Sequence, residues 1–262
     1  MPGPQRAPGE RRHVTIEGVV VRGTELPAAE TLSFLSSGDL RILGLMPGAS
    51  NYTFLCRIEE GGRAMLAVYK PQDGEAPLWD FPDGTLGRRE VAAYVLAAAL
   101  GWPQVPPTVW RDGPEGPGSV QAFVDAEFEQ HYFTLREAHA EQFRRVAAFD
   151  LVANNADRKG GHCLLVRDTG AVWVIDHGVC FAEEPKLRTV IWDHAGEPVP
   201  AEVTGGAARV AGELRSGPLR TSMLSLLTPA EVDATARRAE AVARSRRFPE
   251  PAGRRYYPWP PV

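Results

Sequence analysis

The sequence has little cysteine, no excess of basic residues and no long apolar run. Three cysteines in 262 residues are too few and too far apart for a disulfide framework, which favours a reducing, cytoplasmic compartment. The longest apolar stretch, residues 91–100, is too short to span a bilayer, and the first residues lack the apolar core of a secretory signal. The formal net charge of −4 is unsuited to neutralising a phosphate backbone. We therefore expect no membrane span and no nucleic-acid partner.

Lysine and asparagine are also scarce. The chain has 26 arginines but only three lysines and three asparagines, which are Lys70, Lys159, Lys186, Asn51, Asn154 and Asn155. A compact ammonium and a planar guanidinium are not equivalent, so a lysine that persists in such a chain marks a position where its chemistry is required. The three lysines are therefore the first candidates for functional residues.

The composition is that of a globular protein, with 44% hydrophobic and 24% charged residues. The order of predicted elements indicates an α+β fold with two lobes. We expect a flexible arm over residues 1–12, a β-rich N-lobe over 13–124, a mainly helical C-lobe over 125–248 and a C-terminal tail over 249–262. The tail is rich in proline and aromatic residues, which favours an extended segment that docks on the body or on a partner.

Turn signals and hydrophobic periodicity divide the chain further. In the first half we predict helices over 28–36 and 86–100, and strands over 39–46, 52–58, 63–70, 108–111 and 119–124. In the second half we predict a helix over 134–152, a hairpin over 163–166 and 171–175, and helices over most of 201–247. Thr228 is a predicted N-cap with Glu231 at the reciprocal position, and Lys70 stands at the end of a strand.

Two acidic residues flank the predicted hairpin. Asp157 precedes its first strand and Asp176 directly follows its second, so the hairpin brings both carboxylates to one end. Phosphoryl transfer from ATP uses one carboxylate to orient the attacking hydroxyl, a second to hold the metal ion and a strand lysine to bind phosphate oxygens. Asp157, Asp176 and Lys70 supply these three chemical types.

The strings NADRKGGHCLL and VIDHG resemble the protein-kinase-like fold of the bacterial HipA kinases and the phosphatidylinositol 3-/4-kinases. The whole chain is most similar to an actinobacterial phosphatidylinositol-kinase-like family, and the resemblance covers roughly residues 39–181. It implies a two-lobed protein-kinase-like fold. It also implies an ATP-binding phosphotransferase that depends on Mg²⁺ or Mn²⁺, with an unknown protein or small-molecule acceptor.

The resemblance implies a role for individual residues. Asp157 matches the catalytic aspartate and Asp176 the metal-binding one, while Lys159 stands where those families often have histidine and His162 where they have a metal-ligating asparagine. The residues expected to bind the nucleotide are Lys70, its ion-pair partner Glu90, Ser50, Asn51, Gln121, Phe123 and Val124. The adenine is expected near Val68, Val105 and Phe123. Imidazole in place of an amide oxygen predicts a preference for Mn²⁺ over Mg²⁺.

Other interpretations of these residues stay open at this stage. An Asp-Arg pair in a loop is often a surface ion pair, and a lysine at a strand end is often simply solvated. Four residues around the hairpin could instead form a tetrahedral zinc site, namely His162, Cys163, His177 and Cys180. A nucleotide-binding regulatory protein with little turnover, or an enzyme that transfers AMP, would use the same constellation.

Overall fold

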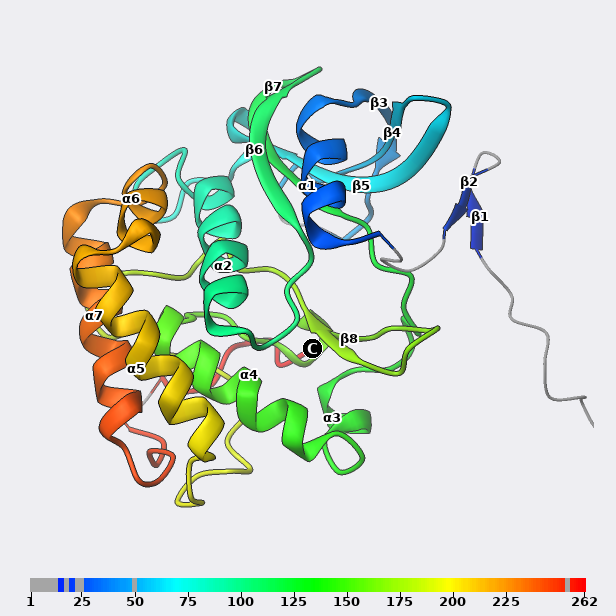
Figure 1. Ribbon diagram of the computed structural model, residues 1–262. Coiled ribbons are helices and arrows are strands. Elements are labelled where there is room, and N and C mark those ends of the chain that lie inside the picture. Colours follow the sequence, from blue (N-terminus) through cyan, green and yellow to red (C-terminus); the bar gives the residue numbers. More distant parts are fainter. Residues whose placement is uncertain (1–13, 17–18, 22–25, 49–50, 253–254) are drawn as a thin grey trace, which may run out of the picture.

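A computed structural model describes residues 14–16, 19–21, 26–48, 51–252 and 255–262. The predicted arm over residues 1–12 lies outside this part of the chain. The described chain folds into two lobes, with a β-sheet in one and most of the helices in the other (Figure 1). The predicted α+β, two-lobed fold is therefore confirmed.

The N-lobe is built on a five-stranded antiparallel sheet in the order β3-β4-β5-β7-β6. Its strands are β3 (Asp39–Leu45), β4 (Phe54–Glu60), β5 (Arg63–Pro71), β6 (Thr108–Gly113) and β7 (Gly116–Ala122). A separate two-stranded sheet pairs β1 (Val14–Ile16) with β2 (Val19–Val21). The helix α1 (Ala28–Ser37) packs on one face of the large sheet, where Phe34 and Leu35 are buried against Ile58 and Tyr69.

Alternation along β5 decides which side chains face the other lobe. Ala67 and Tyr69 are fully buried in the cluster under α1. Successive side chains of a strand point to opposite faces, so Leu66, Val68 and Lys70 point away from α1. The period of the strand thus places a lysine on the face of the sheet that looks toward the C-lobe.

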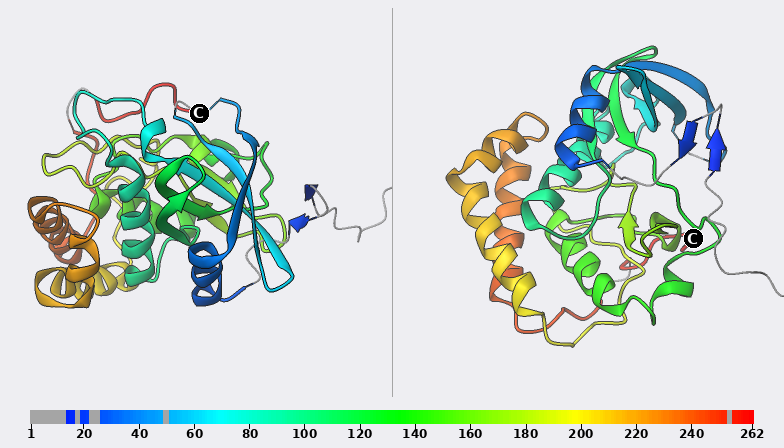
Figure 2. Two further views of the ribbon diagram at one scale, coloured as in Figure 1. Left: turned by 90° about the horizontal axis from the view of Figure 1, so that it is seen from above. Right: turned by 45° about the vertical axis from the view of Figure 1, so that its right-hand side comes forward.

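The helix α2 (Leu86–Leu100) has the bounds predicted from the sequence and ends at Gly101, whose φ of 81° is left-handed. It lies between the lobes (Figures 1 and 2). Leu96 and Leu100 belong to the same buried cluster as Phe143 and Phe149 of the C-lobe. Since this helix is embedded in the C-lobe core, its position relative to that lobe is set by packing.

The C-lobe contains five helices and a short hairpin in the described part of the chain. They are α3 (Tyr132–Leu135), α4 (Ala140–Ala153), β8 (Cys163–Leu165), β9 (Val172–Val174), α5 (Ala201–Ser216), α6 (Pro218–Leu224) and α7 (Pro229–Arg244). The described chain also has two single-turn 3₁₀ helices: η1 (Gln72–Gly74) follows β5, and η2 (Gly160–His162) precedes β8. The predicted cap of α7 is confirmed, because Glu231 N donates to Thr228 Oγ1 at 3.3 Å and Thr228 N donates to Glu231 Oε2 at 2.9 Å.

The single helix predicted over 134–152 is wrong, because the chain bends between α3 and α4. The rings of Tyr132 and Phe143 meet edge-on with centroids 4.9 Å apart. On one straight helix, residues 11 positions apart would be separated by about 16 Å along the axis. Packing between these two aromatic rings therefore requires the bend, and periodicity alone does not reveal it.

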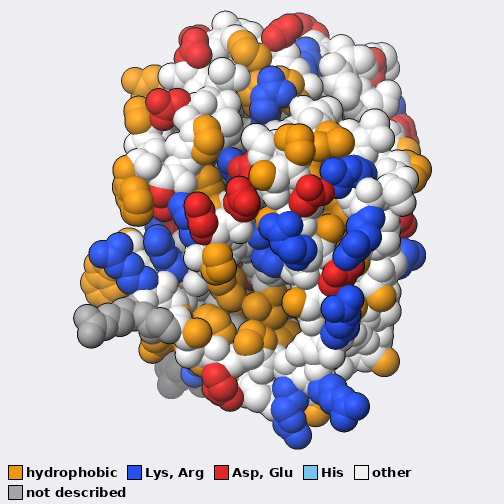
Figure 3. Space-filling view, turned by 90° about the vertical axis from the view of Figure 1, so that its left-hand side faces the viewer, with side chains coloured by type: hydrophobic (Ala, Val, Ile, Leu, Met, Phe, Trp, Pro, Cys, Tyr) orange, Lys and Arg blue, Asp and Glu red, His pale blue; other side chains and the backbone are white. Residues whose placement is uncertain are grey.

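The face formed by α5, α6 and α7 carries charges of both signs (Figure 3). Arg220 pairs with Asp233 at 2.7 Å, and Arg215 pairs with Glu240. Within the described residues, no helix is both long and apolar enough to cross a bilayer.

Candidate active site

Lys70 is the central cation of the site. Its Nζ lies 2.6 Å from Oε1 of Glu90 on α2 and 2.7 Å from Oδ1 of Asp176, which follows β9. Burial favours the neutral amine, but the two carboxylates outweigh it and raise the pKa of Lys70 above its ordinary value. The side chain is therefore a fixed ammonium that joins a strand, a helix and the loop after the hairpin.

Glu90 connects α2 to the segment after β9. Its side chain is only 4% exposed, and its second oxygen, Oε2, accepts a hydrogen bond from His177 N at 2.9 Å. The preceding residue, Arg89, donates to Cys180 O at 2.7 Å and pairs with Glu231 of α7 at 2.5 Å. Two neighbouring charged residues thus hold the start of α2 against the C-lobe.

Asp157 lies in the loop between α4 and η2. Its backbone N donates to Asn155 Oδ1 at 3.0 Å, and Lys159 Nζ lies 3.3 Å from its Oδ2. Burial raises the pKa of Asp157 above its ordinary value, and the ammonium of Lys159 opposes that shift. A carboxylate with a raised pKa beside a cation is suited to accept a proton from a hydroxyl group.

A buried ion pair holds this loop from beneath. Arg158 and Asp150 are both fully buried, and the guanidinium donates to both carboxylate oxygens at 3.0 to 3.2 Å. Asn155 Nδ2 donates to the same carboxylate at 3.0 Å. The Nε2 atom of His177 lies 2.7 Å from Arg158 and must accept, since a guanidinium only donates. This network fixes the backbone that carries Asp157.

Asp176 is the second acidic residue of the site, and His162 lies beside it. His162 Nε2 lies 3.3 Å from Asp176 Oδ2, while its Nδ1 accepts a hydrogen bond of 3.3 Å from Lys159 N. Lys70 holds the pKa of Asp176 well below its usual range, and burial lowers the pKa of His162 to about 4. Asp176 has a left-handed φ of 62°, a conformation that is uncommon outside glycine and that collects at functional sites.

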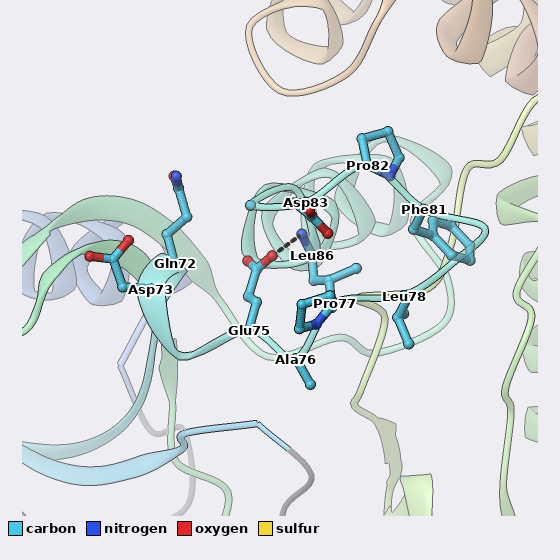
Figure 4. A pocket seen from close by; sticks show the side chains of 11 residues that line it. Gln72, Asp73, Glu75, Ala76, Pro77, Leu78, Phe81, Pro82, Asp83 and Leu86 are labelled. Carbon is cyan, nitrogen blue, oxygen red and sulfur yellow. Dashed lines mark hydrogen bonds between the residues drawn. The ribbon is translucent and has the colours of Figure 1, made fainter.

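These side chains surround one cavity of about 210 Å³ between the lobes. Its polar lining is Asn51, Lys70, Glu75, Glu90, Asp157, His162 and Asp176. A neighbouring pocket of about 330 Å³ lies along the loop between β5 and α2 (Figure 4). It shares four lining residues with the first cavity, namely Glu75, Ala76, Leu78 and Leu86. In that loop Glu75 accepts hydrogen bonds from Leu86 N and Gly87 N and so caps the start of α2.

The other residues predicted to bind the nucleotide do not all lie at the cavity. Ser50 lies outside the described residues, and Asn51 Oδ1 accepts from Ala76 N at 2.8 Å. Gln121 lies inside β7, where its buried side chain donates to Thr108 at 2.9 Å. Phe123 and Val124 follow the strand, which ends two residues earlier than predicted. Gln121 therefore lies inside the sheet, paired with Val68 of β5 on one side and with Thr108 of β6 on the other.

The predicted adenine surface divides between two environments. Phe123 packs against Leu66 on the cleft face of the sheet, and Val68 on the same face is half-buried. Val105 is instead buried in the core of the C-lobe, with 5% of its surface exposed. Val68 and Phe123 can therefore meet a flat ring, whereas Val105 is enclosed in the C-lobe core.

The zinc alternative fails in the structure. Among the described residues no three histidine, cysteine or acidic side chains converge on a metal-binding point. Cys163 and Cys180 are buried thiols, and burial raises the pKa of Cys163 to about 12, which disfavours the thiolate that zinc requires.

Sequence reasoning missed several residues that build the site. The capping of α2 by Glu75, the contact of His177 with Arg158 and the pairing of Arg89 with Glu231 join residues far apart in the sequence, and no local pattern predicts these contacts. Lys186 carried one signal, the scarcity of lysine. Its Nζ donates to Asp80 O at 2.8 Å and lies 4.9 Å from the centre of the Phe81 ring, so it fastens the loop before α2 to the C-lobe.

Comparisons with known proteins identify the fold. The family "Phosphatidylinositol 3- and 4-kinase" matches residues 90–214. The Golgi casein kinase with Mn/ADP bound superposes with a TM-score of 0.51 at 14% identity, covering 82% of this chain and 74% of that one. Hydra Fam20 with sugar gives 0.52 at 14% identity, covering 82% and 86%. The fold is therefore a protein-kinase-like fold.

Proteins with similar sequences show the family to which the chain belongs. Protein Rv2133c of Mycobacterium tuberculosis is 41% identical over 261 residues, covering 86% of this chain and 93% of that protein. The chain belongs to the same family as this mycobacterial protein. Phosphatidylinositol 4-kinase gamma 4 of Oryza sativa is 28% identical over 210 residues, covering 66% of this chain but 37% of the plant protein. The chain thus spans about a third of that plant kinase.

Proposed function

We propose that the protein transfers the γ-phosphoryl group of ATP to a hydroxyl group of an acceptor, with a divalent metal ion. One observation carries the proposal: the ammonium of Lys70 joins Glu90 and Asp176 in a cavity that Asp157 also lines. Phosphoryl transfer depends mainly on positioning and charge stabilisation, and this cavity holds a fixed cation and two acidic positions of different pKa.

The cavity suits a nucleotide that enters with its base toward the apolar end of the cleft. Leu66 and Val68 precede Lys70 on β5, and Phe123, which directly follows β7, packs against Leu66 on the same face. A base on this surface directs its phosphates toward the ammonium. The short distances to Glu90 and Asp176 keep that ammonium aimed at the phosphates, since charge-assisted hydrogen bonds are the stronger kind.

The donor set fits a divalent cation that is also bound by phosphate oxygens. Asp176 offers a carboxylate with a depressed pKa, and neutral His162 lies 3.3 Å from it, so two protein donors are available. Mg²⁺ and Mn²⁺ sites in nucleotide enzymes commonly use one or two protein ligands plus phosphates. Such an ion would neutralise charge on the phosphates. Because Lys159 N donates to Nδ1, ligation through Nε2 requires the other tautomer of His162.

Asp157 and Lys159 act at the acceptor end of the reaction. The acceptor hydroxyl passes its proton to the Asp157 carboxylate while its oxygen forms a bond to the γ-phosphorus. The bond between that phosphorus and the bridging oxygen breaks, and ADP leaves with the electron pair. Lys159, 3.3 Å from Asp157, lies where it can stabilise negative charge on the transferred group.

The test measures nucleotide binding and transfer separately. ATP with Mn²⁺ or Mg²⁺ should raise the melting temperature of the wild type, and Lys70→Met should reduce that shift. Asp157→Asn should leave the shift intact while lowering transfer from γ-labelled ATP by about 10²- to 10⁴-fold. Asp168→Asn, in the turn between β8 and β9, is the matched control and should behave as wild type. The absence of any melting shift with ATP, ADP or GTP would overturn the proposal.

Label position identifies the group that is transferred. Label from γ-labelled ATP on the acceptor supports phosphoryl transfer. Label from α-labelled ATP would instead show AMP transfer, and nucleotide binding without transfer of either label would show a regulatory protein.

Metal preference tests the position of His162. If its Nε2 holds the metal, the wild type should favour Mn²⁺ over Mg²⁺, and His162→Asn should move the preference toward Mg²⁺. An unchanged ratio in the variant would mean that His162 only donates a hydrogen bond to Asp176.

A further inference from the structure

The C-terminal segment, residues 255–262, contacts the loop that carries Asp157. Gly160 N donates to Pro261 O at 2.7 Å, and Gly160 is buried. The next residue, Gly161, lies against the side chain of Val262. The end of the described chain lies beside β8 and α3, next to the catalytic loop (Figures 1 and 2).

The same segment reaches that loop by a second route. Thr189 N and Trp192 Nε1 both donate to Tyr256 O, at 3.1 and 3.2 Å. Thr189 in turn forms a parallel bridge with Arg158, in which Val190 N donates to Arg158 O at 3.1 Å. The backbones of the C-terminal segment, residues 188–192 and the catalytic loop therefore lie side by side.

These contacts satisfy groups that the loop cannot satisfy alone. A buried N–H without a partner is costly, so a catalytic loop that lost the segment would rearrange to bond Gly160 N elsewhere. Gly160 is three residues from Asp157 and adjacent to Lys159. A displacement of about 1 Å at a reacting group costs on the order of 10²-fold in rate.

We infer that the C-terminal segment is a positioning element for phosphoryl transfer: it holds Gly160 so that Asp157 and Lys159 meet the γ-phosphate. This inference rests on the proposed function. The segment touches neither Lys70 nor Asp176 in any described contact, so it should affect turnover and leave nucleotide binding unchanged.

Two matched pairs of full-length variants test the inference. Pro258 is buried, so Pro258→Asp should release the segment, whereas Trp259→Asp places the same charge on a side chain that is 87% exposed. A Cβ at Gly160 would lie 3.0 Å from Phe133 and 3.4 Å from Pro261 O, whereas one at Gly161 would meet nothing closer than 3.9 Å. Gly160→Ala and Gly161→Ala thus form the second pair.

Three measurements are made on each variant: the kcat of γ-phosphoryl transfer to acceptor or water, the shift in melting temperature with ATP and metal, and the rate of hydrogen exchange at the backbone amide of residue 160. Pro258→Asp and Gly160→Ala should lower kcat by about 10- to 100-fold, keep the melting shift and speed the exchange. The two controls should match the wild type in all three.

The outcomes separate this inference from the proposed function. Unchanged exchange at Gly160 in folded Pro258→Asp, or unchanged kcat despite faster exchange, would overturn the positioning role. A kcat loss accompanied by an equal loss of the melting shift would also overturn it, because the segment would then support nucleotide binding. A wild type without melting shift or turnover would overturn the proposed function, and the exchange measurement, which needs no nucleotide, would still show whether the segment holds the loop.

Discussion

The buried ion pair between Arg89 and Glu231 offers the sharpest test of how α2 is held. Arg89 is 1% exposed and Glu231 is 9% exposed, and their side chains are 2.5 Å apart although 142 residues separate them in the sequence. Glu231 also accepts from Thr228 at the start of α7. Replacing it with glutamine keeps a residue that can complete this capping box and removes the charge.

The magnitude follows from leaving a guanidinium buried without a counter-ion. Removing one partner of a buried pair costs about 3 to 5 kcal/mol, and Glu231→Gln should lie near 3 because the amide oxygen still accepts. For a chain of this size that is about 6 to 12 °C in melting temperature. Glu240→Gln on the same helix is the control, since its partner Arg215 is exposed and such pairs contribute about 0 to 1 kcal/mol.

A double-mutant cycle in urea then measures the coupling. Arg89→Met with Glu231→Gln carries neither charge, so it should lose less stability than Glu231→Gln alone. A cost below about 1 kcal/mol for Glu231→Gln, or additive losses in the double variant, would refute the reasoning. Nucleotide-induced stabilisation should fall together with folding stability in the single variant, because Arg89 adjoins Glu90 at the start of α2.

The pair also predicts a pH dependence. Burial opposes ionisation of Glu231, but the Thr228 N–H and Arg89 outweigh it and lower its pKa below the ordinary 4.5. A carboxyl group whose pKa is lower in the folded protein than in the unfolded protein stabilises the fold. This stabilisation is complete above the pKa of the unfolded state and is lost as the pH falls through the pKa of the folded state. The difference between wild type and Glu231→Gln should therefore be full at pH 7 and shrink below about pH 4.

Three further predictions concern other parts of the molecule. The native protein should react with a thiol reagent far more slowly than the unfolded protein, and rapid stoichiometric labelling would contradict the burial of Cys56, Cys163 and Cys180. Gly118→Ala should lower the free energy of unfolding by about 1 to 3 kcal/mol, because its Cβ would meet the carbonyl of Lys70, whereas Gly44→Ala, with no neighbour within 4 Å, should cost little in the same urea titration. Lys186→Met should speed limited proteolysis of the loop before α2, because the substitution removes the ion pair with Asp80. A cleavage rate that mass spectrometry finds unchanged would show that this loop is ordered without Lys186.

Local patterns predicted much of the secondary structure and of the candidate site. The helix of α2 and the cap of α7 follow from side chains within a few residues of each other, where periodicity and capping act directly. Lys70, Asp157 and Asp176 could be singled out because scarcity and spacing around a hairpin mark them. The structure brings all three to one cavity together with Glu90. Their roles stay predictions that the proposed experiments test.

The bend between α3 and α4 and the side chain of Gln121 show where such patterns stop. Both depend on contacts with partners that the sequence does not place. The edge-on contact of Tyr132 with Phe143 breaks an otherwise continuous helical pattern. Thr108 on the neighbouring strand accepts the Gln121 amide and turns that side chain into the sheet.

The sequence by itself determined most of the order of strands and helices, the lysine at the end of a strand and the acidic residue at each end of a hairpin, because these depend on neighbours along the chain. Only the tertiary structure decided that Arg89 meets Glu231, that Glu75 caps α2 and that Pro261 binds Gly160. Each of these contacts joins groups whose separation in space is set by the packing of whole elements. The type of each residue sets its charge and its hydrogen-bonding capacity, but the packing of the two lobes determines which partner it contacts.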